Sequence, residues 1–258
     1  MKKILIFIVG FIFIFSHIVN AKNGERLNAF VQANKAYAKG DYQTAIDQYQ
    51  KIIDSGKPTG SLYYNMGNCY FRQDKIGWAI LYYERAMQYI PNDPDLQFNL
   101  RHVRNQIEDQ VEKKTSFPLK STLDKFSISS LFWFITICNI GFWGILIIRR
   151  FHRSEWSYYT FVGLSILWTI SLVSYSSKWY IIKTDNRGVI VASKTIVRAG
   201  PDERETKLFE LHSGTIVGCE RQEGDWRLVQ FSQGKRGWAK ISDIVLIITK
   251  DKQRKLPI

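Results

Sequence analysis

The segments ANKAYAKGDYQTAIDQYQKII (Ala33–Ile53) and GNCYFRQDKIGWAILYYERAM (Gly67–Met87) decide the fold of the N-terminal half, because they align at an offset of 34 residues. The aligned pairs are small or aromatic: Ala33 with Gly67, Ala45 with Ala79, and Tyr49 with Tyr83. A helix pair that recurs at such a period cannot bury its apolar face alone and is stabilised by stacking on its copy. The sequence therefore predicts two stacked helix pairs, with small residues where the helices of a pair touch.

This period and pattern resemble the tetratricopeptide repeat family. Ala86 and Pro91 complete the second copy, whereas the first copy ends less regularly, with Ile52 and Pro58 at its last positions. Beyond the second copy, Asp93-Pro94-Asp95 predicts a helix start, and apolar residues follow at helical spacing: Leu96, Leu100, Val103 and Ile107. Arg101 replaces the small residue of a third repeat, so we expect residues 94–113 to form a cap helix and residues 22–113 to form one repeat domain.

The resemblance implies a concave groove lined by the first helix of each pair. On this chain the groove would carry Asn34, Tyr37, Tyr64, Asn65, Asn68, Phe71 and Arg72, together with Phe98 and His102 from the cap helix. Aromatic side chains supply contact area and amides orient a bound backbone, so we expect this surface to bind a protein partner. An ordinary helix surface is the alternative. Recognition of a C-terminal carboxylate is not predicted, because Phe30, Asp95 and Asn99 occupy the positions where that clamp needs basic residues.

The C-terminal region consists of short β-rich runs: GVIVAS, TIVRAGP, GTIVGCE, DWRLVQF and RGWAKISDIVLI. Alternating apolar residues between Gly and Pro turn signals predict a small all-β barrel over residues 187–247. The order of IVRAGP, LHSGTIV, GDWRLVQF and GKRGWAKISDI resembles the bacterial SH3-like family, which commonly binds cell-wall glycopeptides or proteins. Trp226 and Trp238 are the candidate ligand contacts of this domain, although in so small a barrel we favour a packing role for both rings.

The N-terminus has the features of a secretory signal. Lys2 and Lys3 precede an apolar run that continues to Val19, and Ala21 offers a small residue for cleavage. We therefore expect a signal peptide over residues 1–21, with an uncleaved signal anchor as the alternative. Either form would export the repeat domain.

Two further apolar stretches predict a membrane hairpin. The spans are residues 128–148 and 158–176, and the turn between them, residues 149–157, contains Arg149, Arg150 and Arg153. Because short loops rich in arginine stay in the cytoplasm, we expect both large domains on the exported, periplasmic side of a bacterial inner membrane. Residues 114–127 and 177–186 are read as linkers, and residues 248–258 as a basic tail.

Composition excludes several functions. The formal net charge of +13 is spread along the chain without a dense Lys/Arg stripe, which argues against nucleic acid. Cys69, Cys138 and Cys219 lie in different segments, so no disulfide or thiolate metal site is indicated. The motifs HExxH, GxSxG and the phosphate loop are missing from the sequence. We therefore expect a protein that is not an enzyme and has no cofactor.

The predicted fold class is a multidomain α plus β protein, with a repeat domain, a two-helix membrane hairpin and an SH3-like barrel. This order resembles BatE-like proteins of the bacterial Bat aerotolerance family. The resemblance implies an inner-membrane complex with von Willebrand-type Bat proteins, and membrane lipid as surroundings. The leading hypothesis is a scaffold that binds a protein partner through the repeat groove; the alternative is a tether that grips peptidoglycan through the SH3-like domain.

Overall fold

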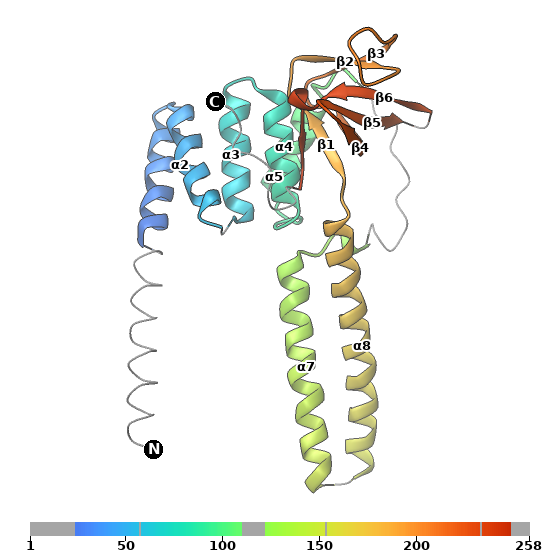
Figure 1. Cartoon of the computed structure of the whole chain (residues 1–258). Helices are drawn as coiled ribbons and strands as arrows, with labels where there is room; N and C mark the ends of the chain where they lie inside the picture. Colours follow the sequence, from blue (N-terminus) through green and yellow to red (C-terminus); the bar gives the residue numbers. More distant parts are fainter. Residues whose placement is uncertain (1–23, 57, 110–121, 153, 233, 249–258) are drawn as a thin grey trace, which may run out of the picture.

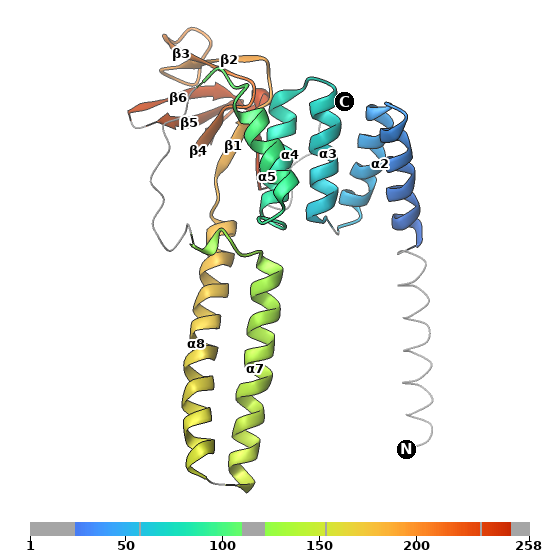
Figure 2. The same ribbon diagram turned by 180° about the vertical axis from the view of Figure 1, so that it is seen from behind.

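The computed structural model describes residues 24–56, 58–109, 122–152, 154–232 and 234–248. The predicted signal peptide, residues 110–113 of the predicted cap helix, residues 114–121 of the first predicted linker and residues 249–258 of the predicted tail lie outside these ranges. Figure 1 shows a row of helices beside a β-sheet, with two long helices extending away from both. In the opposite view the sheet again lies at the α4 end of the row (Figure 2).

The row begins with a helix over residues 24–38 and continues with α2 (Tyr42–Asp54), α3 (Gly60–Arg72), α4 (Ile76–Met87) and α5 (Pro94–Arg104). The helix starts are capped by side chains: Asp41, Thr59 and Asp93 each accept a hydrogen bond from the backbone N–H three residues on. The turns within the two pairs also correspond. Gly40 has φ of 80°, and Asp74, at the equivalent position 34 residues later, has φ of 59°. Both turns thus use the left-handed conformation that ends a helix.

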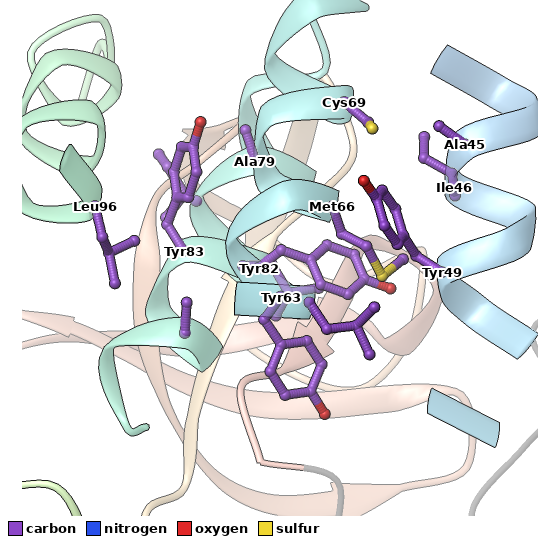
Figure 3. Packing of buried hydrophobic residues seen from close by; sticks show 14 of the residues in the cluster. Ala45, Ile46, Tyr49, Tyr63, Met66, Cys69, Ala79, Tyr82, Tyr83 and Leu96 are labelled. Carbon is purple, nitrogen blue, oxygen red and sulfur yellow. The ribbon is translucent and has the colours of Figure 1, made fainter. Parts of the chain in front are cut away.

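The two helix pairs share the same packing, as the repeat alignment predicts (Figure 3). Ala33, Ala45, Ala79 and Tyr83 are fully buried and Tyr49 is 1% exposed. The Tyr49 hydroxyl donates a hydrogen bond to Asn34 Oδ1 at 2.5 Å, and the Tyr83 hydroxyl donates to Asn68 Oδ1 at 2.7 Å. A Cβ atom at Gly67 would lie 2.5 Å from the Tyr83 ring, which explains why this position has no side chain. The periodic small residues and tyrosines therefore fix how each pair closes.

The cap helix is shorter than the predicted range 94–113. α5 ends at Arg104, and the N–H of Asn105 bonds to the carbonyl groups of Arg101 and Val103. The helix stops because the following segment turns toward the sheet, where Asp109 accepts hydrogen bonds from His212 and Thr215. Over residues 105–109, contacts with the C-terminal domain thus take the place of the predicted helix.

The sheet has seven strands in the order β3-β2-β6-β5-β4-β1-β7, and every recorded pairing is antiparallel. The strands are β1 (Arg187–Ile190), β2 (Lys194–Arg198), β3 (Lys207–His212), β4 (Ile216–Glu223), β5 (Trp226–Ser232), β6 (Lys235–Lys240) and β7 (Ile244–Leu246). In the described residues β3 and β7 do not pair with each other, so closure into a barrel stays a prediction. The β-rich runs of the sequence omit β3, because this edge strand is largely exposed and lacks a clear apolar alternation.

The two long helices are α7 (Ile128–Phe151) and α8 (Glu155–Lys183). They extend beyond the predicted spans 128–148 and 158–176, so much of the predicted turn 149–157 and of the predicted linker 177–186 is helical. Ser154 and Ser157 form a capping box that starts α8 early. The 29 residues of α8 correspond to about 43 Å of helix, longer than a hydrocarbon core of roughly 30 Å. The linker prediction was wrong because the helix continues past its apolar part.

Both helices expose apolar surface along their length. Their most apolar windows have mean hydropathy of 2.1 and 1.3, and side chains such as Ile137 and Ile140 are 66% and 68% exposed. The helices pack on each other through aromatic rings, including Phe142 and Trp168 stacked at 5.2 Å. Length and composition make both helices compatible with membrane insertion, and their outward apolar surface has the same implication.

Candidate functional site

The nine predicted groove residues lie on the helix over residues 24–38, α3 and α5, which are the first helices of the pairs and the cap helix. We call this surface the repeat face: Asn34, Tyr37, Tyr64, Asn65, Asn68, Phe71, Arg72, Phe98 and His102. Contacts join the three helices across it. Asn65 Nδ2 lies 3.5 Å from Asn34 Oδ1, and the Phe71 and His102 rings lie 5.8 Å apart. The structure therefore brings the nine residues into one surface.

The α5 end of the repeat face is apolar and accessible. Phe98 is 63% exposed, and its ring stacks with His102 at 6.4 Å. Phe71 completes the group by an edge contact with His102. Exposed aromatic rings held by neighbours lose little conformational freedom on binding, so this cluster is the strongest candidate anchor for an apolar side chain.

The centre of the repeat face is an amide and hydroxyl network. Asn99 Nδ2 donates to the Tyr64 hydroxyl at 3.0 Å and to Asn68 Oδ1 at 3.2 Å. Burial raises the pKa of Tyr49 to about 12 and also raises the pKa of Tyr83, so both hydroxyls stay protonated donors at neutral pH. Asn34 and Asn68, predicted as partner-binding residues, therefore also hold the repeat core. From the sequence, Asn99 was noted only because it occupies a position where a carboxylate-binding clamp needs a basic residue. In the structure its side chain joins α5 to α3.

Arg72 gives the repeat face a fixed positive charge. The side chain is exposed, and a hydrogen bond with Tyr37 raises the pKa of its guanidinium group. Two hollows in the described surface lie elsewhere, one where the α4–α5 loop meets the start of α7 and one between the first helix and α2. Neither of these hollows is on the repeat face, whose exposed rings and amides suit contact with an extended segment.

The two candidate tryptophans of the SH3-like domain are buried. Trp226 is 9% exposed and Trp238 is 5% exposed, and both pack with Leu228 in a small cluster. Cations cover the rings: Arg221 lies 5.1 Å from the Trp238 centroid, and Lys240 Nζ lies 5.8 Å from the Trp226 centroid. This burial favours a packing role over direct ligand contact.

The sheet packs directly on the repeats, which the sequence did not indicate. Val189 and Ile247 belong to the same buried cluster as the repeat core. The Gly77 N–H donates to Ser213 Oγ at 3.0 Å, and Arg85 donates to the carbonyl groups of Leu246 and Ile247 at 3.0 and 2.9 Å. The repeat domain and the SH3-like domain therefore share one hydrophobic core and are not connected by linkers alone.

A second set of contacts ties the end of the repeat domain to the β3–β4 turn. Asp109 Oδ2 accepts hydrogen bonds from the His212 N–H and from Thr215 Oγ1, both at 2.6 Å. Burial opposes ionisation of Asp109, but the bonds from Thr215 and His212 outweigh it and hold the pKa of this carboxyl below its usual value. Asp109 is thus a charged anchor between the domains.

The acidic, histidine and cysteine side chains of the described residues are dispersed. Within the described ranges, no group of three or more His, Cys, Asp or Glu side chains could hold a metal ion. Burial raises the pKa of Cys69 to about 12 and that of Cys219 to about 11, so neither thiol is an activated nucleophile.

Comparison with known families supports the two domain types. Residues 61–93 match the tetratricopeptide repeat family, which covers α3, α4 and the loop that follows. Residues 191–245 match the bacterial SH3 domain family. No curated protein matches the chain. The chain therefore contains a tetratricopeptide repeat and a bacterial SH3 domain, joined by two apolar helices that are compatible with membrane insertion.

Proposed function

We propose that this protein is a membrane-anchored, non-enzymatic scaffold that holds a protein partner on its repeat face. The observation that carries the proposal is the continuous surface of aromatic, amide and arginine side chains across three helices, with Phe98 exposed at its end. The tetratricopeptide match agrees with a role in protein–protein interaction. The repeat face has one exposed arginine and no cluster of charges, so apolar contacts and backbone hydrogen bonds would supply the recognition.

The finer assignment concerns the complex itself. The order of repeats, apolar hairpin and SH3-like domain resembles BatE-like proteins, and this resemblance supports a place in a Bat-type assembly of the bacterial inner membrane. A von Willebrand-type partner bound at the repeat face is the corresponding proposal. Lipid would surround the exposed apolar side chains of α7 and α8.

Site-specific photo-crosslinking in intact cells tests the scaffold. A photoreactive amino acid replaces Phe98 or Arg72, both exposed on the repeat face, and Lys51 on α2 serves as an exposed control outside it. We expect one dominant membrane or exported protein to crosslink from positions 98 and 72 and not from position 51. A correctly inserted chain that gives no protein crosslink from the repeat face, or the same products from position 51, would contradict the scaffold.

The alternative function is a cell-wall tether through the SH3-like domain, favoured by the bacterial SH3 match over residues 191–245. In that case the full chain should be retained on purified peptidoglycan, and retention should survive Phe98→Ala combined with Arg72→Ala. The burial of Trp226 and Trp238 favours other side chains of the domain for any such contact. This burial is the reason that we rank the tether second.

The proposed topology puts both domains in the exported compartment. The two domains lie at the same end of the α7–α8 pair, and Arg149 and Arg150 lie at the opposite end (Figure 1). A reporter fused after Ile258 should therefore be active only in the exported compartment, whereas a reporter inserted after His152 should be active only in the cytoplasm. Cytoplasmic activity of the C-terminal fusion would overturn this arrangement.

A further inference from the structure

The junction between the long helices and the two domains contains a buried carboxylate that no sequence motif announces. Glu84 lies in the last turn of α4 and is only 4% exposed. Its Oε1 pairs with Arg104 of α5, and its Oε2 lies 3.2 Å from Nη1 of Arg187, the first residue of β1. A buried carboxylate is unfavourable unless it is paired, so this one favours a single arrangement of α4, α5 and β1.

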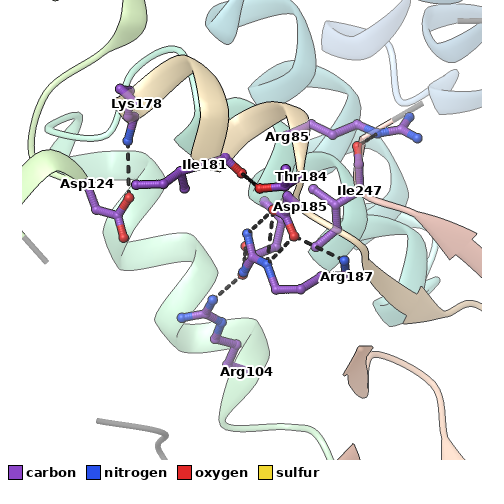
Figure 4. Close-up of polar contacts among 10 residues, drawn as sticks. Arg85, Arg104, Asp124, Lys178, Ile181, Thr184, Asp185, Arg187 and Ile247 are labelled. Carbon is purple, nitrogen blue, oxygen red and sulfur yellow. Dashed lines mark hydrogen bonds and ion pairs between the residues drawn. The ribbon is translucent and has the colours of Figure 1, made fainter. Parts of the chain in front are cut away.

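Arg187 is in turn fixed to the end of α8. Its guanidinium group binds the Asp185 carboxylate through Nε at 3.0 Å and Nη2 at 2.8 Å (Figure 4). Burial lowers the pKa of Arg187, but Glu84 and Asp185 outweigh it and raise the pKa, so the side chain stays charged. Because the planar guanidinium binds two fixed carboxylates, it fixes the position of Asp185 relative to Glu84.

The residues between α8 and β1 do not form a flexible connection. The Thr184 hydroxyl donates to the Tyr180 carbonyl at 2.8 Å, and the Asp185 N–H donates to the Ile182 carbonyl at 3.1 Å. Asn186 exchanges two hydrogen bonds with Cys219 of β4, at 2.7 and 2.9 Å. Every residue from 184 to 186 is thus bonded to an ordered element.

The other helix of the pair is attached at the same level. Lys178 of α8, which is 5% exposed, donates to Asp124 Oδ1 at 3.1 Å, just before α7 begins. Asn92, in the α4–α5 loop, donates to the Lys125 carbonyl at 2.8 Å. The segment just before α7 is therefore bonded both to the C-terminal part of α8 and to the repeat domain.

We propose that Glu84 and Arg187 are positioning residues that lock the repeat and SH3-like domains onto the α7–α8 pair as one rigid body. The repeat face then has a fixed orientation to the membrane instead of swinging on linkers. The coupling runs from α8 through Asp185 and Arg187 to Glu84 of α4, and from α4 to α3 and α5, which carry seven of the nine residues of the repeat face. The α7–α8 pair would thereby set the orientation of the bound partner relative to the membrane.

Distance measurement between spin labels in the full chain, reconstituted in lipid nanodiscs, tests this lock. Cysteines introduced at the exposed positions Lys51 and Ser176 carry the labels, while the native Cys69, Cys138 and Cys219 are buried. We expect one narrow distance distribution in the parent protein. Arg187→Gln and Glu84→Gln should each broaden the narrow peak, because each removes one charge of the ion pair between α4 and β1.

Two controls separate the lock from general destabilisation. Lys240→Gln breaks the exposed pair of Lys240 with Glu203, and it should leave the distribution unchanged. Arg187→Lys keeps a charge near Glu84 and should recover part of the narrow peak. A broad distribution in the parent protein overturns the proposal whatever the variants do, and so does an unchanged narrow peak in both Arg187→Gln and Glu84→Gln.

Discussion

Tyr83→Ala is expected to lower the free energy of unfolding by about 3–5 kcal/mol, the usual cost of removing a fully buried aromatic ring. Tyr83 has no exposed surface, lies against Gly67, and packs 6.0 Å from the Tyr64 ring on the repeat face. Its loss leaves a cavity between α3 and α4 that neither helix can fill without moving. The variant should also weaken partner binding, because Tyr64 and Asn68 lose their support.

Thermal unfolding of the full chain in mild detergent, followed by circular dichroism, measures this effect. The expected decrease in the free energy of unfolding corresponds to a decrease of roughly 10 °C in Tm for the joined repeat and SH3-like domains. Tyr83→Phe is the matched control: it keeps the ring and loses only the hydroxyl bond to Asn68, for a cost of about 1 kcal/mol. Equal Tm values for Tyr83→Ala and the parent protein would mean that this ring does not close the second helix pair.

Gly214→Val should separate the two domains and lower the free energy of unfolding by about 2–5 kcal/mol, from left-handed strain and overpacking together. Gly214 has φ of 92°, and a Cβ atom there would lie 2.7 Å from Ile80 Cδ1 of α4. A β-branched residue is strained at this φ even in open space, and here it also collides with the core of the repeats.

Gly224→Val provides the comparison, because Gly224 has φ of 54° and nothing within 4 Å of its Cβ position. This variant carries the strain without the collision. We expect Gly214→Val to open the interface, seen as faster hydrogen exchange in both α4 and the β3–β4 turn. Gly224→Val should raise exchange only near its own turn. Similar exchange patterns in the two variants would show that the interface does not depend on close packing at Gly214.

The sequence by itself determined the elements whose signals are local. The offset of 34 residues located both helix pairs, since the small residues and tyrosines that recur in it are the ones that touch. Runs of apolar residues located α7 and α8, and turn signals located most strands. The nine residues of the repeat face were named from the resemblance to the tetratricopeptide family, which assigns the groove to the first helix of each pair.

Tertiary structure decided what depends on contacts between distant segments. α8 continues as a helix to Lys183, past its predicted boundary, and Lys178 in this continuation is bonded to Asp124. α5 ends before its predicted boundary, and the segment after it is held by Asp109, which is bonded to the β3–β4 turn. Asn99 and Glu84 were missed for the same reason: each has an ordinary place in its helix, and only its partners give it a role. Nothing within α4 or β1 predicts that Glu84 meets Arg187, since a pair separated by 103 residues leaves no periodic signal. Local patterns therefore fixed the parts of this protein, and long-range packing and ion pairs fixed how those parts are joined.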